Sequence, residues 1–355
     1  MVEPAIGTLL PAFFHCRWFV SHETTQIEDQ HGQDVAVAWT VFRLNWLILA
    51  VLLAIFDLSL LLTDFRIRPL GYLGVLAVAA MYGISGHLNA KSARRARPRL
   101  FSCLIGFAQT VLGMSILASL TYIATAANLP LQDATLLAID RALGFDFQRL
   151  VIFVDHREWM IRIVAFGYGA IGWMIYLIVV VLPLTGYCRR AAEFVLALML
   201  ALAMTCCITM AVPAIGVYHA LGVVPSDYLH FSPGGYYDTA REMPLIRDGS
   251  LRLLDVSKLA GVVTFPSFHA ASATLYAWAL WPWRWFRPVN IMVNGATMVA
   301  TPIGGGHFLV DMLAGIAVAI LAICAARSAA RLISIESATV SRAVSGCSRL
   351  QLGPS

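Results

Sequence analysis

Ionisable side chains enter otherwise apolar segments at two places in the last third of the chain. In the segment FPSFHAASA, Ser267 and His269 follow Pro266. In the segment GGGHFLVDMLAG, His307 and Asp311 stand four residues apart. An ionisable group in a membrane segment is costly, roughly 2.5–3.5 kcal/mol at mid-membrane and less near the interface, so these residues indicate a partner or a function.

The spacing of His307 and Asp311 places both side chains on one face of a helix. Asp311 can then accept a hydrogen bond from the imidazole, which fixes the tautomer and leaves the other ring nitrogen free to attack. His269 follows a proline at the start of a helix and is suited to protonate a leaving oxygen. Ser267 offers a further hydrogen-bond donor. These residue types predict the transfer of a phosphoryl group.

Three glycines, Gly304, Gly305 and Gly306, precede the second histidine. Because glycine has no side chain, backbone N–H groups can approach a ligand there, and the helix that follows has an electropositive N-terminus. We therefore expect Gly305 and Gly306 to bind phosphate. A metal site would use the same His and Asp residues but would not account for the glycines, and interhelical hydrogen bonding is the other alternative. No metal and no cofactor are expected.

The composition shows what must position these residues. Of 355 residues, 59% are hydrophobic and only 13% are charged, which is too apolar for a water-soluble core of this size. Several stretches reach the ~20 residues that cross a hydrocarbon core of ~30 Å, and lipid leaves unpaired backbone groups without a partner, so helices are expected. We predict an all-α polytopic transmembrane helical bundle with about eight spans, at roughly 42–62, 69–87, 101–126, 160–185, 193–217, 266–283, 288–304 and 308–326.

Basic residues gather in the connections after the second, fourth, sixth and eighth predicted spans. By the positive-inside tendency, these connections and both termini are cytoplasmic. The connections 63–68, 127–159, 218–265 and 305–307 then lie on the non-cytoplasmic face of the cell membrane, together with both His segments. The same pattern explains the net charge of +5, so membrane lipids, and not nucleic acid, are the expected surroundings.

The spans divide the chain into four parts. We predict a cytoplasmic tail over 1–39, two accessory helices and a basic loop over 40–100, a six-span catalytic core over 101–332, and a cytoplasmic tail over 333–355. The N-terminus lacks a basic leader, so a cleaved signal peptide is not expected. The seven cysteines are scattered and match neither a disulfide framework nor zinc-ligand spacing.

Two of the predicted outer connections are long. The first contains DATLLAIDRALGFDFQRLVIF, which is expected to lie along the interface as two short helices, with Gly144 where a helix would stop. The simplest explanation of this segment is a pair of amphipathic helices that cover the membrane interface and have no further function. The second contains LIRDGSLRLLD and leads into the first His segment, so Arg247 and Arg252 are candidate phosphate ligands. Surface solubility is the alternative explanation of these two arginines.

The two His segments resemble the motifs of the type 2 phosphatidic acid phosphatase superfamily, Pro-Ser-x-His and a later His-x-x-x-Asp. They are most similar to the branch that contains inositolphosphorylceramide synthases and their bacterial relatives, as are LLAIDRALGFDF and VPAIGVY, and the resemblance covers about 130–326. It implies that His307 is a nucleophile that forms a phosphohistidine and that Asp311 orients it. It also implies that His269 is the general acid and then the base, that Ser267 binds phosphate oxygens, and that no metal is required.

The chain departs from that superfamily in its cations. Phosphatase members carry an Arg six residues before the second His, where this chain has Thr301, and a Gly before the first His, where it has Phe268. Their Lys-x6-Arg-Pro motif is missing, because the string from Lys91 to Arg97-Pro98 has one residue too few and lies on the predicted cytoplasmic side. A dianionic group in a partly dry pocket needs compensating charge. The resemblance therefore leaves phosphate binding unexplained.

Three functions fit these observations. The first is a metal-independent phosphatase that hydrolyses a lipid phosphate or diphosphate at the outer face. The second keeps the covalent step but passes the phosphoryl-containing head group to an alcohol, as the synthase resemblance implies. The third is a non-catalytic protein that binds lipid phosphate, which the missing cations suggest. Substrate identity and protein partners are not indicated by the sequence.

Overall fold

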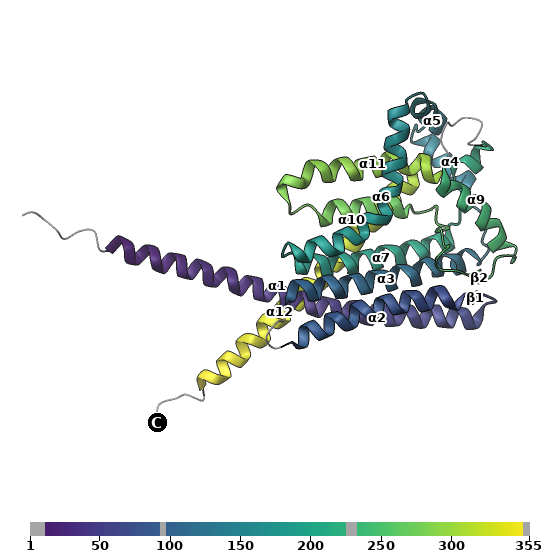
Figure 1. Cartoon of the computed structure of the whole chain (residues 1–355). Helices are drawn as coiled ribbons and strands as arrows, with labels where there is room; N and C mark the ends of the chain where they lie inside the picture. The colour runs from purple at the N-terminus through teal and green to yellow at the C-terminus, as the bar shows by residue number, and fades with distance from the viewer. Residues whose placement is uncertain (1–10, 93–96, 225–232, 351–355) are drawn as a thin grey trace, which may run out of the picture.

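The computed structural model of the chain describes residues 11–92, 97–224 and 233–350, and these are almost entirely helical. Long helices lie side by side, and short helices gather over one end of the bundle (Figure 1). The elements in chain order are α1 (Pro11–Leu62), β1 (Arg66–Ile67), α2 (Pro69–Lys91), α3 (Pro98–Thr125), α4 (Asp133–Ala142), α5 (Phe147–Asp155), α6 (Glu158–Leu184), α7 (Cys188–Ala211), α8 (Val217–Leu221), α9 (Gly234–Arg247), β2 (Leu253–Leu254), α10 (Phe268–Ala279), η2 (Arg284–Phe286), α11 (Arg287–Gly305) and α12 (Leu309–Leu350).

Within the described ranges, six helices are long and apolar enough to cross a membrane, which confirms the expectation of a helical membrane protein. They are α1 from Gly32 onward, α2, α3, α6, α7, and α12 as far as Glu336. The predicted spans 266–283 and 288–304 are instead α10 and α11, which are not among these six. At ~1.5 Å per residue, the 12 residues of α10 extend about 18 Å, well short of the hydrocarbon core. The predicted count of eight spans is therefore not confirmed.

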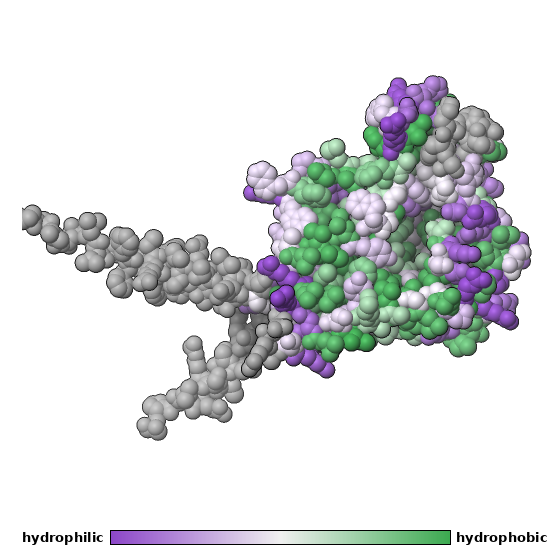
Figure 2. Space-filling model, in the orientation of Figure 1, coloured by the Kyte–Doolittle hydropathy of each residue, from purple (hydrophilic) through white to green (hydrophobic). Residues whose placement is uncertain are grey.

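The surface of the bundle has the distribution expected of a membrane protein. Apolar side chains cover its middle, and polar side chains gather at its two ends (Figure 2). Large apolar residues on α1 and α2 are exposed, among them Leu61 at 82% and Leu70 at 81%. Lipid is the solvent in which such exposure carries no cost.

Helices α1, α3 and α7 are joined at the centre of the bundle by buried amides. Asn45 of α1 donates to the side chain of Gln109 of α3 and to the carbonyl of Ala192 of α7, at 3.2 and 3.4 Å. Gln109 in turn donates to the carbonyl of Phe42, at 2.7 Å. Interhelical hydrogen bonds of this kind stabilise helix packing where lipid provides no hydrophobic driving force between helices.

A two-stranded parallel sheet joins the loop between α1 and α2 to the segment that precedes the first His motif. The backbone N–H groups of Arg66 and Arg68 donate to the carbonyls of Arg252 and Leu254, both at 2.8 Å. Arg68 also forms a salt bridge of 3.1 Å with Asp255. The loop between α1 and α2 is therefore attached to the segment that leads into the first His motif, a contact that the sequence did not predict.

The short helices α4, α5, α8 and α9 lie over the same end of the bundle as β1 and β2 (Figure 1). Helices α4 and α5 are the two short helices predicted in the first long connection, and the chain turns between them at Gly144, whose φ is +76°. Helix α11 ends and α12 begins at this end too, which brings the second His motif to the end of the bundle that the short helices cover (Figure 1).

Candidate active site

The two His motifs meet where the start of α10 packs against α12. Ser267 is the N-cap of α10, and its side chain accepts a hydrogen bond of 3.3 Å from the N–H of Ala270. The N–H of Ser267 donates to the carbonyl of Asp311, at 3.0 Å. A Cβ at Gly315 would collide with the carbonyl oxygen of Ser267, so this close approach requires glycine on α12. The structure thus brings Ser267, His269, His307 and Asp311 together.

His307 is held in one orientation by two acceptors on the same ring nitrogen. Its Nδ1 lies 2.9 Å from the carbonyl oxygen of Thr264 and 3.4 Å from Oδ2 of Asp311. The nearer acceptor is therefore a backbone carbonyl that the sequence did not reveal. Because Nδ1 faces two acceptors, we assign the proton to it, which leaves a lone pair on Nε2.

Asp311 is buried completely, and His307 is only 3% exposed. Oδ2 of Asp311 also accepts a hydrogen bond of 2.9 Å from the N–H of Phe308, so the carboxylate caps its own helix as well as facing the imidazole. A carboxylate with these two neighbours holds both the helix start and the ring in place.

His269 faces His307 across a short gap and stacks on an aromatic ring. The centroids of the two imidazoles are 6.1 Å apart. The ring of Tyr168, from α6, stacks on His269 with centroids 4.2 Å apart and an interplanar angle of 16°. Sequence reasoning missed Tyr168. Its signal is the preceding Gly167 inside an apolar span, where the backbone of Ala296 approaches closely, since small residues on a membrane helix indicate close approach of a neighbour.

The three glycines before His307 allow aromatic rings to pack against the backbone. A Cβ at Gly304 would lie 2.7 Å from the ring of Tyr168, and one at Gly306 would lie 2.9 Å from the ring of Tyr236. A Cβ at Gly305 would lie 2.6 Å from Cδ2 and 2.9 Å from Nε2 of His307. The backbone at Gly305 therefore lies directly beside the nitrogen that carries the lone pair, and the expected contacts of Gly305 and Gly306 with phosphate remain predictions.

The first N–H groups of α12 are already occupied by carboxylates. Asp140 of α4 accepts from the N–H of Leu309 at 2.7 Å and from that of Val310 at 2.9 Å. The N–H of Phe308 is bound to Asp311, as described above. The sequence predicted that the start of this helix binds phosphate, but these N–H groups already donate to carboxylates. Burial raises the pKa of Asp140, whereas the two N–H donors lower it by a smaller amount.

A second carboxylate of α4 holds the other side of the same turn. Asp133 accepts from the N–H groups of Ile215 and Gly216, at 3.0 and 2.8 Å. The next N–H, of Val217, donates to the carbonyl of Gly306 at 2.7 Å. LLAIDRALGFDF and the aspartate just before it are therefore more than an amphipathic cover, because Asp133 and Asp140 position the backbone on both sides of His307.

The two arginines proposed as phosphate ligands are not brought into contact with the histidines. The guanidinium of Arg252 donates to the carbonyls of Ile246 and Leu251, at 2.6 and 3.1 Å, and lies over the ring of Phe65. Arg247 is at the C-terminal end of α9, about 18 Å along the helix axis from Gly235, the residue that contacts Tyr168. One nitrogen of Arg247, Nη1, is buried without a hydrogen-bond partner.

Thr301 stands six residues before His307, at the position for which the resemblance noted above implies an arginine. It is buried, and its hydroxyl donates to the carbonyl of Thr297 at 2.7 Å. Among the residues that the structure describes, no three His, Cys, Asp or Glu side chains gather in an arrangement that could hold a metal ion. Two carboxylates lie at the second His motif: Asp311 contacts His307, and Asp140 binds the N–H groups of Leu309 and Val310.

The family model of the PAP2 superfamily matches residues 134–325, which is more than half of the chain. The match begins in α4, includes both His motifs and ends in α12. It indicates a phosphatase-type function. Neither a curated protein nor a solved structure matches the chain significantly.

Proposed function

We propose that this chain, which belongs to the PAP2 superfamily of phosphatases and phosphotransferases, hydrolyses a lipid phosphate or diphosphate through a phosphohistidine at His307. The observation that carries the proposal is the orientation of this histidine. Its Nδ1 is bound to the Thr264 carbonyl at 2.9 Å, so Nε2 is free to attack, and a second imidazole lies 6.1 Å away between ring centroids. The second imidazole is therefore near enough to act on the same phosphoryl group.

In the first step, Nε2 of His307 forms a bond to phosphorus. The bond between phosphorus and the leaving oxygen breaks, and that oxygen takes a proton from His269. In the second step, water attacks the phosphohistidine, the phosphorus–nitrogen bond breaks, and His269 accepts the proton of the water. His307 regains its lone pair and inorganic phosphate leaves. Asp311 and the Thr264 carbonyl stabilise the positive charge that develops on the imidazole of His307.

The position of the site supports a substrate whose head group lies at a membrane surface. Both His motifs lie at the end of the bundle opposite the one where α1 enters and α12 leaves (Figure 1). With the positive-inside pattern, that end is the non-cytoplasmic face, and both termini are cytoplasmic. A lipid phosphate in the outer leaflet would present its head group at the level of His307 while its chains remain in the bilayer.

The burial of His307 favours a second candidate function, transfer of the phosphoryl-containing head group to an alcohol. His307 is only 3% exposed, and transfer needs an intermediate that is shielded from water. The synthase-like branch suggested by the sequence performs such a reaction. The covalent step is the same in both cases, and only the acceptor differs. A degenerate member that binds lipid phosphate without turnover remains the non-enzymatic alternative, because the site lacks the cations of its relatives.

The test is inorganic phosphate release from a panel of lipid phosphates and diphosphates, measured in the presence of a chelator. The full chain is compared with His307→Ala and with His219→Ala, which removes an exposed histidine of α8. We expect release by the wild type and by His219→Ala, and no release by His307→Ala. Retained turnover in His307→Ala would exclude the phosphohistidine route. If the wild type releases nothing, addition of an alcohol acceptor distinguishes head-group transfer from binding alone.

A further inference from the structure

A groove on the accessory helices lies far from the His motifs, at the other end of the bundle. It is a cavity of about 510 Å³ between α1, α2 and α3, and its walls are largely apolar. Trp46 of α1 and Leu112 of α3 line it on one side, and Leu76, Gly83 and Ile84 of α2 on the other. None of the residues assigned to the proposed phosphatase reaction lines this groove.

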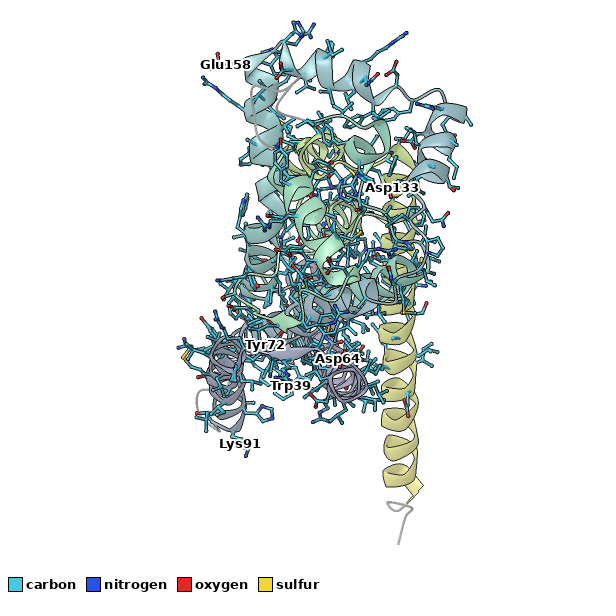
Figure 3. The ribbon with its side chains drawn as sticks, turned by 90° about the vertical axis from the view of Figure 1, so that its right-hand side faces the viewer. Trp39, Asp64, Tyr72, Lys91, Asp133 and Glu158 are labelled. Carbon is cyan, nitrogen blue, oxygen red and sulfur yellow. The ribbon has the colours of Figure 1, made fainter. Side chains whose placement is uncertain are left out.

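A second cavity of about 300 Å³ adjoins this groove, and its otherwise largely apolar lining includes the cations Arg43 and Lys91. Trp46, His87 and Lys91 line both cavities, so the two are adjacent. The second cavity adds Arg43 and Trp39. Seen along the bundle, Trp39 lies between α1 and α2, and Lys91 lies at the end of α2 (Figure 3). One end of the groove is therefore basic and the remainder is apolar.

Three polar groups at the basic end have no partner among the described residues. In the part of the chain that the structure describes, neither Arg43 nor Lys91 forms a salt bridge. The indole nitrogen of Trp39 is buried without a hydrogen-bond partner. A buried N–H donor without an acceptor is costly, typically about 1–3 kcal/mol, so this donor indicates that an acceptor from outside the chain binds here.

The depth of the basic end matches the head-group region of a bilayer. Arg43 lies about 20 residues before the end of α1 at Leu62, which is the length that crosses a hydrocarbon core of ~30 Å. Lys91 is the last residue of α2. The apolar part of the groove then lies at the depth of acyl chains, and the cations and the indole N–H lie at the depth of phosphate.

We propose that this groove binds a glycerophospholipid with an anionic head group. One acyl chain lies along Leu76, Gly83 and Ile84, and the phosphate and head group contact Arg43, Lys91 and the indole N–H of Trp39. Basic pockets between membrane helices recognise anionic lipids through this combination of charge and apolar surface. The site is separate from the proposed catalytic centre, so the lipid is a structural or regulatory ligand of the accessory helices and its binding does not depend on turnover.

The experiment measures lipid retained by the full chain after release from nanodiscs that contain equal amounts of phosphatidylglycerol and phosphatidylcholine, by native mass spectrometry. We expect the wild type to retain phosphatidylglycerol preferentially. The double substitution of Arg43→Gln with Lys91→Gln should lower the ratio of phosphatidylglycerol to phosphatidylcholine by roughly 30-fold, since each cation near a membrane surface contributes to anionic lipid binding. Arg284→Gln, an exposed cation in the connection between α10 and α11, should leave the ratio unchanged.

A second pair of variants tests the apolar part. Gly83 lines the groove and Gly74 does not, and a Cβ at either residue meets nothing within 4 Å. Gly83→Leu should displace the acyl chain and reduce retention of both lipids about tenfold, whereas Gly74→Leu should retain lipid as the wild type does. Equal retention by the two leucine variants, or a wild-type lipid ratio near one, would overturn the proposal. Cross-linking of a photoreactive amino acid at Leu76 to another polypeptide, and to no lipid, would overturn it as well.

Discussion

The two halves of the candidate active site are built to very different degrees. Around the proposed nucleophile, the ring and the backbone are both held: Thr264 and Asp311 hold the ring of His307, and Asp140 holds the backbone that follows it. Around the phosphate, the arginines that the sequence suggested are bound to other parts of the chain or lie far along α9. The fold therefore positions the proposed nucleophile, whereas the arginines that the sequence indicated do not supply the charge that would compensate a phosphate.

The sharpest test of the nucleophile half is the leaving group. His269→Ala should lower kcat for a lipid phosphate by roughly 10²–10⁴-fold, because the alkoxide then leaves without a proton. For an aryl phosphate, whose leaving oxygen needs no proton, the first step should be nearly unaffected. With the aryl phosphate, His269→Ala should release a burst of phenol and then release phosphate slowly. This result would show that His269 acts in the second step, and the loss of kcat with the lipid phosphate would show that it acts in the first. Equal losses for both substrates would contradict its role as the acid.

Gly305 tests whether the space beside His307 must stay empty. In Gly305→Ala the new methyl group would stand 2.9 Å from Nε2, so it would cover the attacking lone pair or displace the ring. We expect kcat to fall about 100-fold, since a displacement of ~1 Å at a reacting atom has that effect. Gly295→Ala is the matched control on the same helix, because a Cβ there meets nothing within 4 Å. Comparable rates in the two variants would remove the geometric argument for Nε2 as nucleophile.

Asp140 separates the positioning of His307 from general stability. Asp140→Ala removes two acceptors from the start of α12 and should lower the free energy of unfolding by about 1 kcal/mol, the usual cost of a lost cap. Asp146→Ala removes a comparable cap from α5, where Asp146 accepts from the N–H of Arg149 at 3.1 Å. Only Asp140→Ala should also lower kcat, about tenfold, with KM unchanged. If both variants lose stability and neither loses kcat, Asp140 is a structural residue alone.

The sequence predicted the parts of the fold that depend on local pattern. Long apolar segments indicated most of the membrane helices, and Gly144 marked the turn between α4 and α5. The predicted count of eight spans is not confirmed, because the segments of α10 and α11 are not among the long apolar helices, and α10 has only 12 residues between its N-cap Ser267 and the turn after Ala279. The length of a helix between two turns depends on tertiary contacts, which hydropathy does not record.

In the site, the sequence indicated the residues that are unusual for their surroundings and missed those that are ordinary. His269, His307 and Asp311 are conspicuous because they are ionisable in apolar segments. Asp133 and Asp140 lie in a polar connection, where acidic residues are common, and the Thr264 carbonyl has no side-chain signature at all. Their contacts with Gly216, Leu309 and His307 join segments far apart in the chain, so no local spacing could reveal them.

The smallest expected effect concerns the phosphate half. Arg252 donates to two backbone carbonyls and lies over Phe65, so Arg252→Gln should lower stability and change KM less than threefold, within the usual range of a residue that does not touch substrate. Arg241→Gln, which removes an exposed cation paired with Asp238 and Glu242, is the control. Arg247→Gln differs, since its buried Nη1 has no partner. A tenfold rise in KM in Arg247→Gln alone would show that α9 moves this guanidinium toward the phosphate when substrate binds. In the complex, the phosphate would then have a compensating cation, just as His307 has its positioning contacts.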